Sequence, residues 1–244
     1  MNPSPALSII LPCYNEAANI PFIFERFRKD VGERNDVEVI LVNNGSTDAS
    51  GTVIKDLLQN PSNRFARTIL VNPNQGYGYG IMKGIQAASG EVLSWTHADL
   101  QTDPADVLSA FERFRTQPDM TRCFLKGNRI KRPLLDASFT LGMSLLSSLA
   151  LSRVLFDVNA QPKMFHRSFL QRMSNPPSDF SLDLYALYMA RRTGMIILDH
   201  PVNFGQRRHG EAKGGGTLKG KINLIRRTWR CIFRLRREFR EGKY

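Results

Sequence analysis

The sequence predicts an α/β fold in which a doubly wound, mostly parallel sheet is flanked by helices. Short apolar runs alternate with segments whose apolar residues recur at helical spacing. Polar clusters rich in Asn, Gly and Asp follow several of the apolar runs directly. A chain of 244 residues that is 42% hydrophobic is long enough to bury a large core. Ligands of such sheets bind beyond the carboxyl ends of the strands, so the polar clusters mark the candidate site.

The elements alternate along most of the chain. Strands are expected at 7–11, 37–42, 68–71, 91–95, 121–125, 161–166 and 195–198. Helices are expected at 19–34, 49–58, 76–88, 104–115, 134–156, 182–192 and 218–240, with Gly194 ending the sixth. The basic, Gly-rich segment 206–217 is expected to form a mobile loop. We therefore expect one catalytic domain over 1–217, with a nucleotide-binding half at about 1–126 and an acceptor-binding half at about 127–217, followed by a basic amphipathic helix within 218–244.

Charge is distributed unevenly. The net charge is +12, and residues 219–244 hold ten Lys or Arg and two Glu, which places +8 there. A basic end of this kind favours an anionic partner. The segment 134–156 contains Asp136 and Arg153, and its uncharged run is shorter than the ~18 residues of a membrane span. Cysteines without the spacing of a disulfide or zinc site and a short polar start at 1–6 favour a cytoplasmic protein. The basic end favours its peripheral association with the inner face of the membrane.

Six short segments carry a family pattern. They are LPCYNE at 11–16, VNNGSTD at 42–48, NQGYG at 74–78, HADLQ at 97–101, GNR at 127–129 and RHGEAK at 208–213. In this order they resemble the LPxYNE, VDDGSxD, NxGxG, DADLQ, GSR and RxGESK motifs of glycosyltransferase family 2, especially its dolichol-phosphate mannose synthase-like branch. One such motif is weak evidence, whereas the ordered set is specific.

The resemblance implies a GT-A fold and inverting transfer of a sugar from a nucleotide-diphosphate donor. Negative charge grows on the leaving diphosphate, and a divalent cation with basic side chains can stabilise it. By resemblance, Asp99 is the central ligand of Mg²⁺ or Mn²⁺, with Gln101 and His97 assisting. Arg129, and then Arg208 and Lys213, can hold the diphosphate, and Asp183 is an acceptor-side acid. The residues implied to bind the nucleotide sugar are Pro12, Tyr14, Asn15, Glu16, Asn44, Asp48, Gly76, His97, Ala98, Arg208 and Lys213.

Two departures from the family pattern concern this site. His97 stands where the first Asp of DADLQ is expected, and Asn43 and Asn44 replace two aspartates. A neutral imidazole binds Mn²⁺ but suits Mg²⁺ poorly. His97 also fits a polar residue that simply ends a strand. Asn44 keeps a carbonyl acceptor and gains an amide donor, with which it can contact a base edge.

Several residues have structural alternatives of comparable weight. Asp48 suits either nucleotide contact or the cap of a helix. Asp183 suits either an acid at the acceptor or a carboxylate favoured by the start of a helix. The last helix suits either a lipid interface or packing on the core with a solvated basic face. Its apolar stripe is Leu218, Ile222, Ile225, Trp229, Ile232 and Phe233.

The sequence thus predicts a glycosyltransferase that acts on a membrane-proximal acceptor, a polyprenyl phosphate or a lipid-linked glycan. An anionic membrane surface is an expected partner, and nucleic acid is not, because no nucleic-acid module is recognisable. The alternative is a GT-A nucleotide-binding protein without transfer activity, suggested by His97 and the paired asparagines. A sugar-nucleotide nucleotidyltransferase is disfavoured because no Gly-rich, Lys-ended phosphate loop occurs near the N-terminus.

Overall fold

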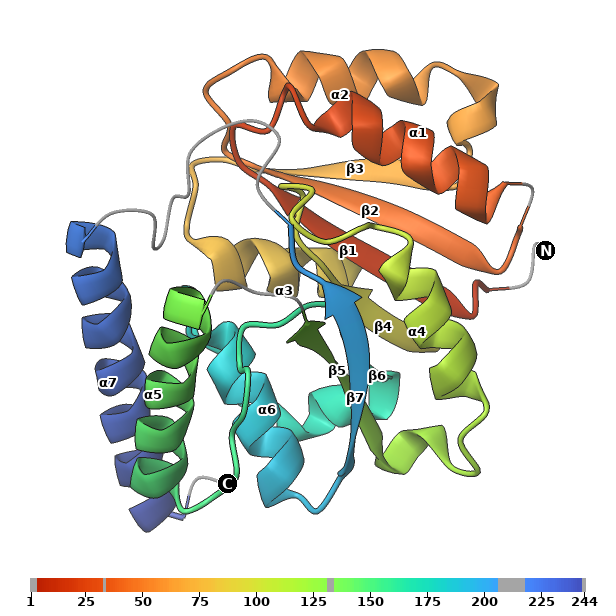
Figure 1. Cartoon of the computed structure of the whole chain (residues 1–244). Helices are drawn as coiled ribbons and strands as arrows, with labels where there is room; N and C mark the ends of the chain where they lie inside the picture. Colours follow the sequence, from red (N-terminus) through yellow and green to blue (C-terminus); the bar gives the residue numbers. More distant parts are fainter. Residues whose placement is uncertain (1–3, 33, 131–133, 206–217, 243–244) are drawn as a thin grey trace.

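A computed structural model describes residues 4–32, 34–130, 134–205 and 218–242 (Figure 1). One seven-stranded sheet runs through the molecule in the order β3-β2-β1-β4-β6-β5-β7. Its strands are β1 (Leu7–Cys13), β2 (Val37–Asn44), β3 (Ala66–Val71), β4 (Val92–Trp95), β5 (Cys123–Ile130), β6 (Lys163–His166) and β7 (Ile196–Asn203). All seven lie where apolar runs predict strands, although β5 and β7 extend five residues further.

The sheet is parallel except at one strand. β6 runs antiparallel to both β4 and β5, whereas β7 is parallel to β5. The carboxyl ends of β1, β2, β4 and β5 therefore lie at one edge, together with the beginning of β6. This edge is where a doubly wound sheet offers a ligand site.

Seven α-helices lie among the described residues. They are α1 (Ile20–Val31), α2 (Ser50–Leu58), α3 (Tyr77–Ala87), α4 (Asp106–Arg115), α5 (Leu134–Leu151), α6 (Leu182–Arg192) and α7 (Leu218–Arg240). The expected helices are confirmed within a few residues, except that the fifth ends five residues early. Gly194 follows α6 with a φ of +73°, the left-handed backbone that favours glycine after a helix.

Alternating strand residues build a core on each face of the sheet. In β2, Ile40 and Val42 face the cluster that contains α3 and α6, whereas Val39 and Leu41 face the cluster that contains α1, α2 and α4. Gly84 of α3 lets that helix lie close to the sheet, because a Cβ there would be 2.4 Å from the side chain of Ile10.

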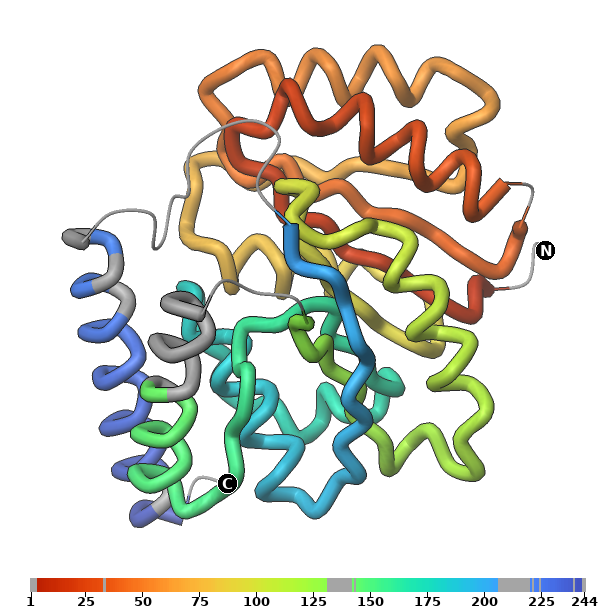
Figure 2. Tube along the Cα trace, in the orientation of Figure 1, coloured from red at the N-terminus to blue at the C-terminus, as the bar shows by residue number. Residues whose placement is uncertain are grey.

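The basic helix α7 is attached to this core. It runs beside α5, as Figures 1 and 2 show. Cys231, Ile232 and Leu235 are buried in the cluster that includes α6, and Glu238 accepts a hydrogen bond of 3.1 Å from Asn175. The second half of α7, from Cys231 to Glu238, therefore packs on the core, as one of the two alternatives predicted. In the described part of the chain, no helix is long and apolar enough to cross a membrane.

Candidate functional site

The predicted motif residues gather where parallel strands end together. Cys13 pairs with Asn43 across β1 and β2, and Ile10 pairs with Trp95 across β1 and β4. The segments that follow these strands, 14–16, 44–48 and 97–101, therefore emerge at the same edge. Register in the sheet brings together the motifs that the sequence separates.

The segments after β1 and β2 are fastened to each other. Asn15 has a φ of +55°, and its backbone N–H donates to Ser46 Oγ at 3.1 Å. The N–H of Thr47 donates back to Asn15 Oδ1 at 2.8 Å, and the N–H of Glu16 donates to Ser50 Oγ at 2.9 Å. The side chain of Asn15 thus shapes the rim of the site. Pro12 and Tyr14 are half-buried beside it.

Asp48 occupies the start of α2. Its Oδ1 accepts from the N–H of Ser50 at 2.9 Å, and its Oδ2 accepts from the N–H of Ala17 at 3.3 Å. The N-cap of α2 is Ala49, and no side chain makes the N-cap hydrogen bond, so Asp48 supports the first N–H of α2 from one residue further out. Its bond to Ala17 links α2 to the segment after β1, and contact of the exposed Asp48 with a nucleotide stays a prediction.

Asn44 faces α3 rather than open space. Its side chain is buried, its Nδ2 donates to the carbonyl of Gly76 at 3.0 Å, and Gly80 lies against it. Gly76 has a φ of +112°, and a Cβ there would lie 2.3 Å from the carbonyl oxygen of Ser178. Asn44 and Gly76 thus seat the start of α3 against the segment before α6. Contact of Asn44 with a base stays a prediction.

The segment after β4 turns sharply at Asp99. Leu100 has a φ of +57°, and the N–H of Gln101 donates to Asp99 Oδ1 at 3.1 Å. Asp99 and Ala98 are buried, and the ring of His97 lies 5.9 Å from that of Tyr77. Within the described residues, no group of three His, Cys, Asp or Glu side chains is arranged to hold a metal ion. The carboxylate of Asp99 fits a hard cation, which can take several of its oxygen ligands from substrate phosphates.

Consecutive residues after β7 connect Arg129 to the Asp99 turn. The ring of Phe204 lies 5.0 Å from the guanidinium carbon of Arg129. Gly205 donates its N–H to the carbonyl of Gln101 at 2.8 Å. Phe204 and Gly205 thus link Arg129 to Gln101, two residues after Asp99. Arg208 and Lys213, predicted to grip the diphosphate, lie outside the described residues.

Arg129 is held by an acid that the sequence analysis did not identify. Its Nε donates to Asp157 Oδ1 at 2.9 Å, its Nη2 contacts the same oxygen, and its backbone N–H donates to Asp157 Oδ2 at 2.9 Å. Asp157 is fully buried. The charge of Arg129 is therefore partly balanced within the protein.

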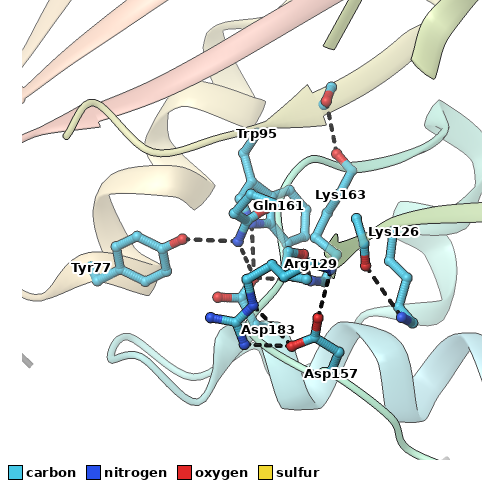
Figure 3. Close-up of polar contacts among 11 residues, drawn as sticks. Tyr77, Trp95, Lys126, Arg129, Asp157, Gln161, Lys163 and Asp183 are labelled. Carbon is cyan, nitrogen blue, oxygen red and sulfur yellow. Dashed lines mark hydrogen bonds and ion pairs between the residues drawn. The ribbon is translucent and has the colours of Figure 1, made fainter. Parts of the chain in front are cut away.

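A buried polar network lies at the beginning of α6 (Figure 3). Asp183 Oδ1 accepts from Trp95 Nε1 at 3.0 Å and from Gln161 Nε2 at 2.8 Å. Lys163 Nζ lies 4.0 Å from the same oxygen. The same Nε2 of Gln161 lies 3.3 Å from the hydroxyl of Tyr77. The start of α6 is thus tied to β4, to β6 and to α3.

Two lysines of this region are almost completely buried. Lys126 Nζ lies 2.6 Å from Asp199 Oδ1, and Lys163 has no exposed surface. Burial lowers the pKa of Lys163 to about 8, against the opposing effect of Asp183. Sequence reasoning missed both lysines, although each is a charged residue beside an apolar run, a pattern that indicates a paired buried charge.

A family comparison agrees with this arrangement of motifs. The family model described as Glycosyl transferase family 2 matches residues 8–172. The chain belongs to glycosyl transferase family 2. The match contains the motifs at the ends of β1, β2, β4 and β5, so the predicted family membership is confirmed.

Several curated relatives of this family 2 chain carry the same name. It is 28% identical over 222 residues to an undecaprenyl-phosphate 4-deoxy-4-formamido-L-arabinose transferase of Pseudomonas fluorescens (strain Pf0-1), covering 87% of this chain and 62% of the relative. It is 26% identical over 235 residues to the protein of that name from Edwardsiella ictaluri (strain 93-146), covering 93% and 67%. The chain thus spans about three fifths to two thirds of the length of these relatives.

Solved structures support the fold. A mannosyltransferase from Pyrobaculum calidifontis, in complex with GDP-Man and Mn²⁺, superposes with a TM-score of 0.64 at 20% identity, covering 85% of this chain and 59% of that one. Glucosyl-3-phosphoglycerate synthase from Mycobacterium tuberculosis, in complex with UDP, superposes with a TM-score of 0.70 at 19% identity, covering 93% and 79%. The predicted GT-A fold, a mostly parallel sheet flanked by helices, is confirmed.

Proposed function

We propose that this family 2 glycosyltransferase transfers a sugar from a nucleotide-diphosphate donor to a polyprenyl phosphate at a membrane surface. The observation that carries the proposal is the convergence of the family motifs, in their family order, on one edge of the sheet. The names of the undecaprenyl-phosphate relatives favour a polyprenyl phosphate over a lipid-linked glycan.

The donor is proposed to lie between the segment after β1 and the turn at Asp99. Asn15 and Glu16 border this space, and the exposed Asp48 lies at its rim. Asp99, with Gln101 and His97 beside it, would hold Mg²⁺ or Mn²⁺ jointly with the diphosphate oxygens. Bound there, the cation stabilises the negative charge on the leaving nucleotide diphosphate. The Mn²⁺ complexes among the structural neighbours support a divalent cation.

The acceptor is proposed to lie near the start of α6 and the end of β5, where Arg129 lies. A phosphate acceptor is already an anion and needs no general base. Arg129, paired with Asp157 but not fully buried, can contact an anion at its remaining N–H donors. Arg129 is thus proposed to contact the acceptor phosphate in addition to the donor diphosphate, the contact that the family resemblance implies for it.

A membrane surface is proposed as a further partner of this chain, which would place the chain peripherally on the cytoplasmic face. Leu149 is 71% exposed on α5, and Phe233 is 61% exposed on the neighbouring α7. Other exposed apolar side chains of these segments are Leu145 and Leu146 on α5, Val154 and Phe156 after it, and Ile222 on α7. Arg226 and Arg230 of α7 are exposed as well. Apolar side chains among arginines suit the interface of an anionic bilayer, where each basic residue contributes about 1 kcal/mol.

A transfer assay tests the proposed activity. The purified chain is incubated with UDP- or GDP-linked radiolabelled sugars, undecaprenyl phosphate in mixed micelles, and Mn²⁺ or Mg²⁺. We expect label to enter the lipid phase only when both the metal and the lipid phosphate are present. Label that appears as free sugar, with no lipid product under any donor, would exclude the proposed acceptor.

The alternative is a nucleotide-sugar-binding protein without transfer activity. It is motivated by His97 and Asn44, since neither supplies the carboxylate that the family pattern has at its position. Thermal unfolding with each donor separates the two functions. A donor at a hundred times its Kd adds about 2.7 kcal/mol of stability whether or not transfer follows. Stabilisation without any product in the transfer assay would favour the binding protein.

Cosedimentation with vesicles that contain phosphatidylglycerol tests the proposed surface. Leu149→Ser and Phe233→Ser should weaken binding, and higher salt should weaken it further because exposed charges are screened. Leu70→Ser is the matched control, since Leu70 is 68% exposed but lies on β3, near the opposite end of the sheet from α5. Equal losses in all three variants would argue against a surface formed by α5 and α7.

A further inference from the structure

The buried carboxylate of Asp183 is surrounded by donors from the protein itself. Trp95 Nε1 at 3.0 Å and Gln161 Nε2 at 2.8 Å both donate to Oδ1. The residue is almost fully buried at the first turn of α6, where its charge also suits the helix N-terminus. Through these contacts, Asp183 holds the side chains of Trp95 and Gln161 in place.

Lys163 supplies the nearest balancing charge. It begins β6 with no exposed surface, and its Nζ lies 4.0 Å from Asp183 Oδ1. The other charged groups acting on it are Asp157, before β6, and two cations of β5, Lys126 and Arg129. A buried ammonium needs a partner of opposite charge, and among the described residues Asp183 is the acid that forms an ion pair with Lys163.

Tyr77 extends this network to the donor side. Its hydroxyl lies 3.3 Å from Gln161 Nε2, and a hydrogen bond with Asp183 contributes to raising its pKa, which burial raises most. Its ring stacks on Phe180 at 4.8 Å and lies 5.9 Å from the ring of His97. One tyrosine therefore connects the carboxylate at α6 with the segment after β4 that contains Asp99.

We propose that Lys163 is a positioning residue that, through the carboxylate of Asp183, fixes the ring of Tyr77 between Phe180 and His97. Asp183 then holds protein groups in place and takes no proton from the acceptor. This role of Asp183 rests on the proposed function, in which the acceptor is a phosphate that needs no general base. The position of the His97 ring, on the donor side, therefore depends on the Lys163–Asp183 charge pair on the acceptor side.

The direct test measures the environment of His97 without any substrate. The chain has four histidines, so the His97 ring signals of ¹³C-histidine-labelled protein can be assigned with a His97→Gln variant. Tyr77→Leu, which removes the neighbouring ring, defines the shift expected when the stack is lost. Lys163→Met should move the His97 signals toward the Tyr77→Leu position, whereas Lys163→Arg should leave them near those of the unmodified chain.

Tyr77→Phe provides a second, less disruptive variant in case Lys163→Met does not fold. It keeps the ring and removes only the hydroxyl that meets Asp183 and Gln161, so it should also shift the His97 signals. Unchanged His97 signals in folded Lys163→Met, or in Tyr77→Phe, would overturn the proposal.

Fluorescence gives an independent readout of the charge pair. The chain has two tryptophans, so Trp229→Phe leaves Trp95, which donates to Asp183, as the single emitter. Because burial lowers the pKa of Lys163 to about 8, Trp95 emission should change as the pH rises through this value and Lys163 loses its charge. Adding Lys163→Met should abolish that transition, and an identical transition in both proteins would contradict the assigned contact.

Both readouts are independent of the proposed activity. If the NMR and fluorescence results are as expected and no sugar transfer is found, the positioning role stands and the proposed acceptor fails. If transfer to the lipid phosphate occurs and the His97 signals ignore Lys163, the activity stands and the positioning role fails.

Discussion

Arg129 and Asp157 form an ion pair in which the acid is fully buried and both carboxylate oxygens accept hydrogen bonds from the arginine residue. Removing one partner leaves an uncompensated charge in the interior. We expect Asp157→Leu to reduce the free energy of unfolding by about 3–5 kcal/mol. Urea denaturation measures this change.

The double variant Arg129→Met with Asp157→Leu distinguishes the pair from ordinary packing. Because it removes both charges, it should recover a large part of the stability that Asp157→Leu loses. Losses that simply add would show that the two side chains do not stabilise each other.

Asp99→Asn tests the proposed metal ligand. We expect turnover in the transfer assay to fall at least ~100-fold, the scale of losing one key electrostatic group, while thermal stability changes little. Asp103→Asn is the control on the same segment, because Asp103 pairs with Arg26 at the surface. Near-normal turnover in Asp99→Asn would remove Asp99 from the site.

His97→Asp restores the carboxylate that the family motif has at this position. A carboxylate suits Mg²⁺ better than an imidazole does, so we expect activity to be kept or raised and the preference to move from Mn²⁺ toward Mg²⁺. Initial rates at matched concentrations of the two ions measure this. Loss of activity with both ions would instead indicate that the ring contact of His97 with Tyr77 is what activity requires.

Asp106 gives a pH-dependent contribution to stability. Burial, with the nearby charge of Asp103, raises its pKa to about 6 from 3.8. The folded state thus binds more protons than the unfolded state between about pH 4 and 6, so this contribution is present at low pH and is lost as the pH rises through 6. Asp106→Asn should stabilise the protein at pH 7 by up to about 1 kcal/mol, allowing for solvent screening, relative to its effect at pH 4. Equal effects at both pH values in urea denaturation would contradict this assignment.

Truncation before α7 tests whether the basic helix can be separated from the catalytic domain. The sequence suggests that it can, but Ile232 and Leu235 are buried against the core. We expect the truncated chain to unfold more readily, and Ile232→Ala alone to cost about 2–5 kcal/mol. Arg226→Ala, at an exposed position of the same helix, should change stability little. If the truncated chain were as stable as the full chain, α7 would be separable from the catalytic domain after all.

Most helices and strands, and the edge of the sheet that carries the motifs, could be predicted from the sequence alone. Strands such as β1 and β2 can be predicted because each is a local run of apolar residues. The polar motif residues, Asn15 and Asp99 among them, follow such runs directly in the sequence. Parallel pairing then brings the strand ends to one edge without further information.

The pairing of the buried charged side chains could not be predicted from the sequence, because it depends on how the helices pack. Arg129 pairs with Asp157, although α5 separates the two residues in the sequence. Asp183 contacts Trp95 and Lys163, which lie on two different strands. No sequence spacing links such partners, because their distances depend on how α5 and α6 pack on the sheet. The same holds for α7, since an apolar stripe fits a lipid interface and a protein core equally well until the neighbouring surface is known.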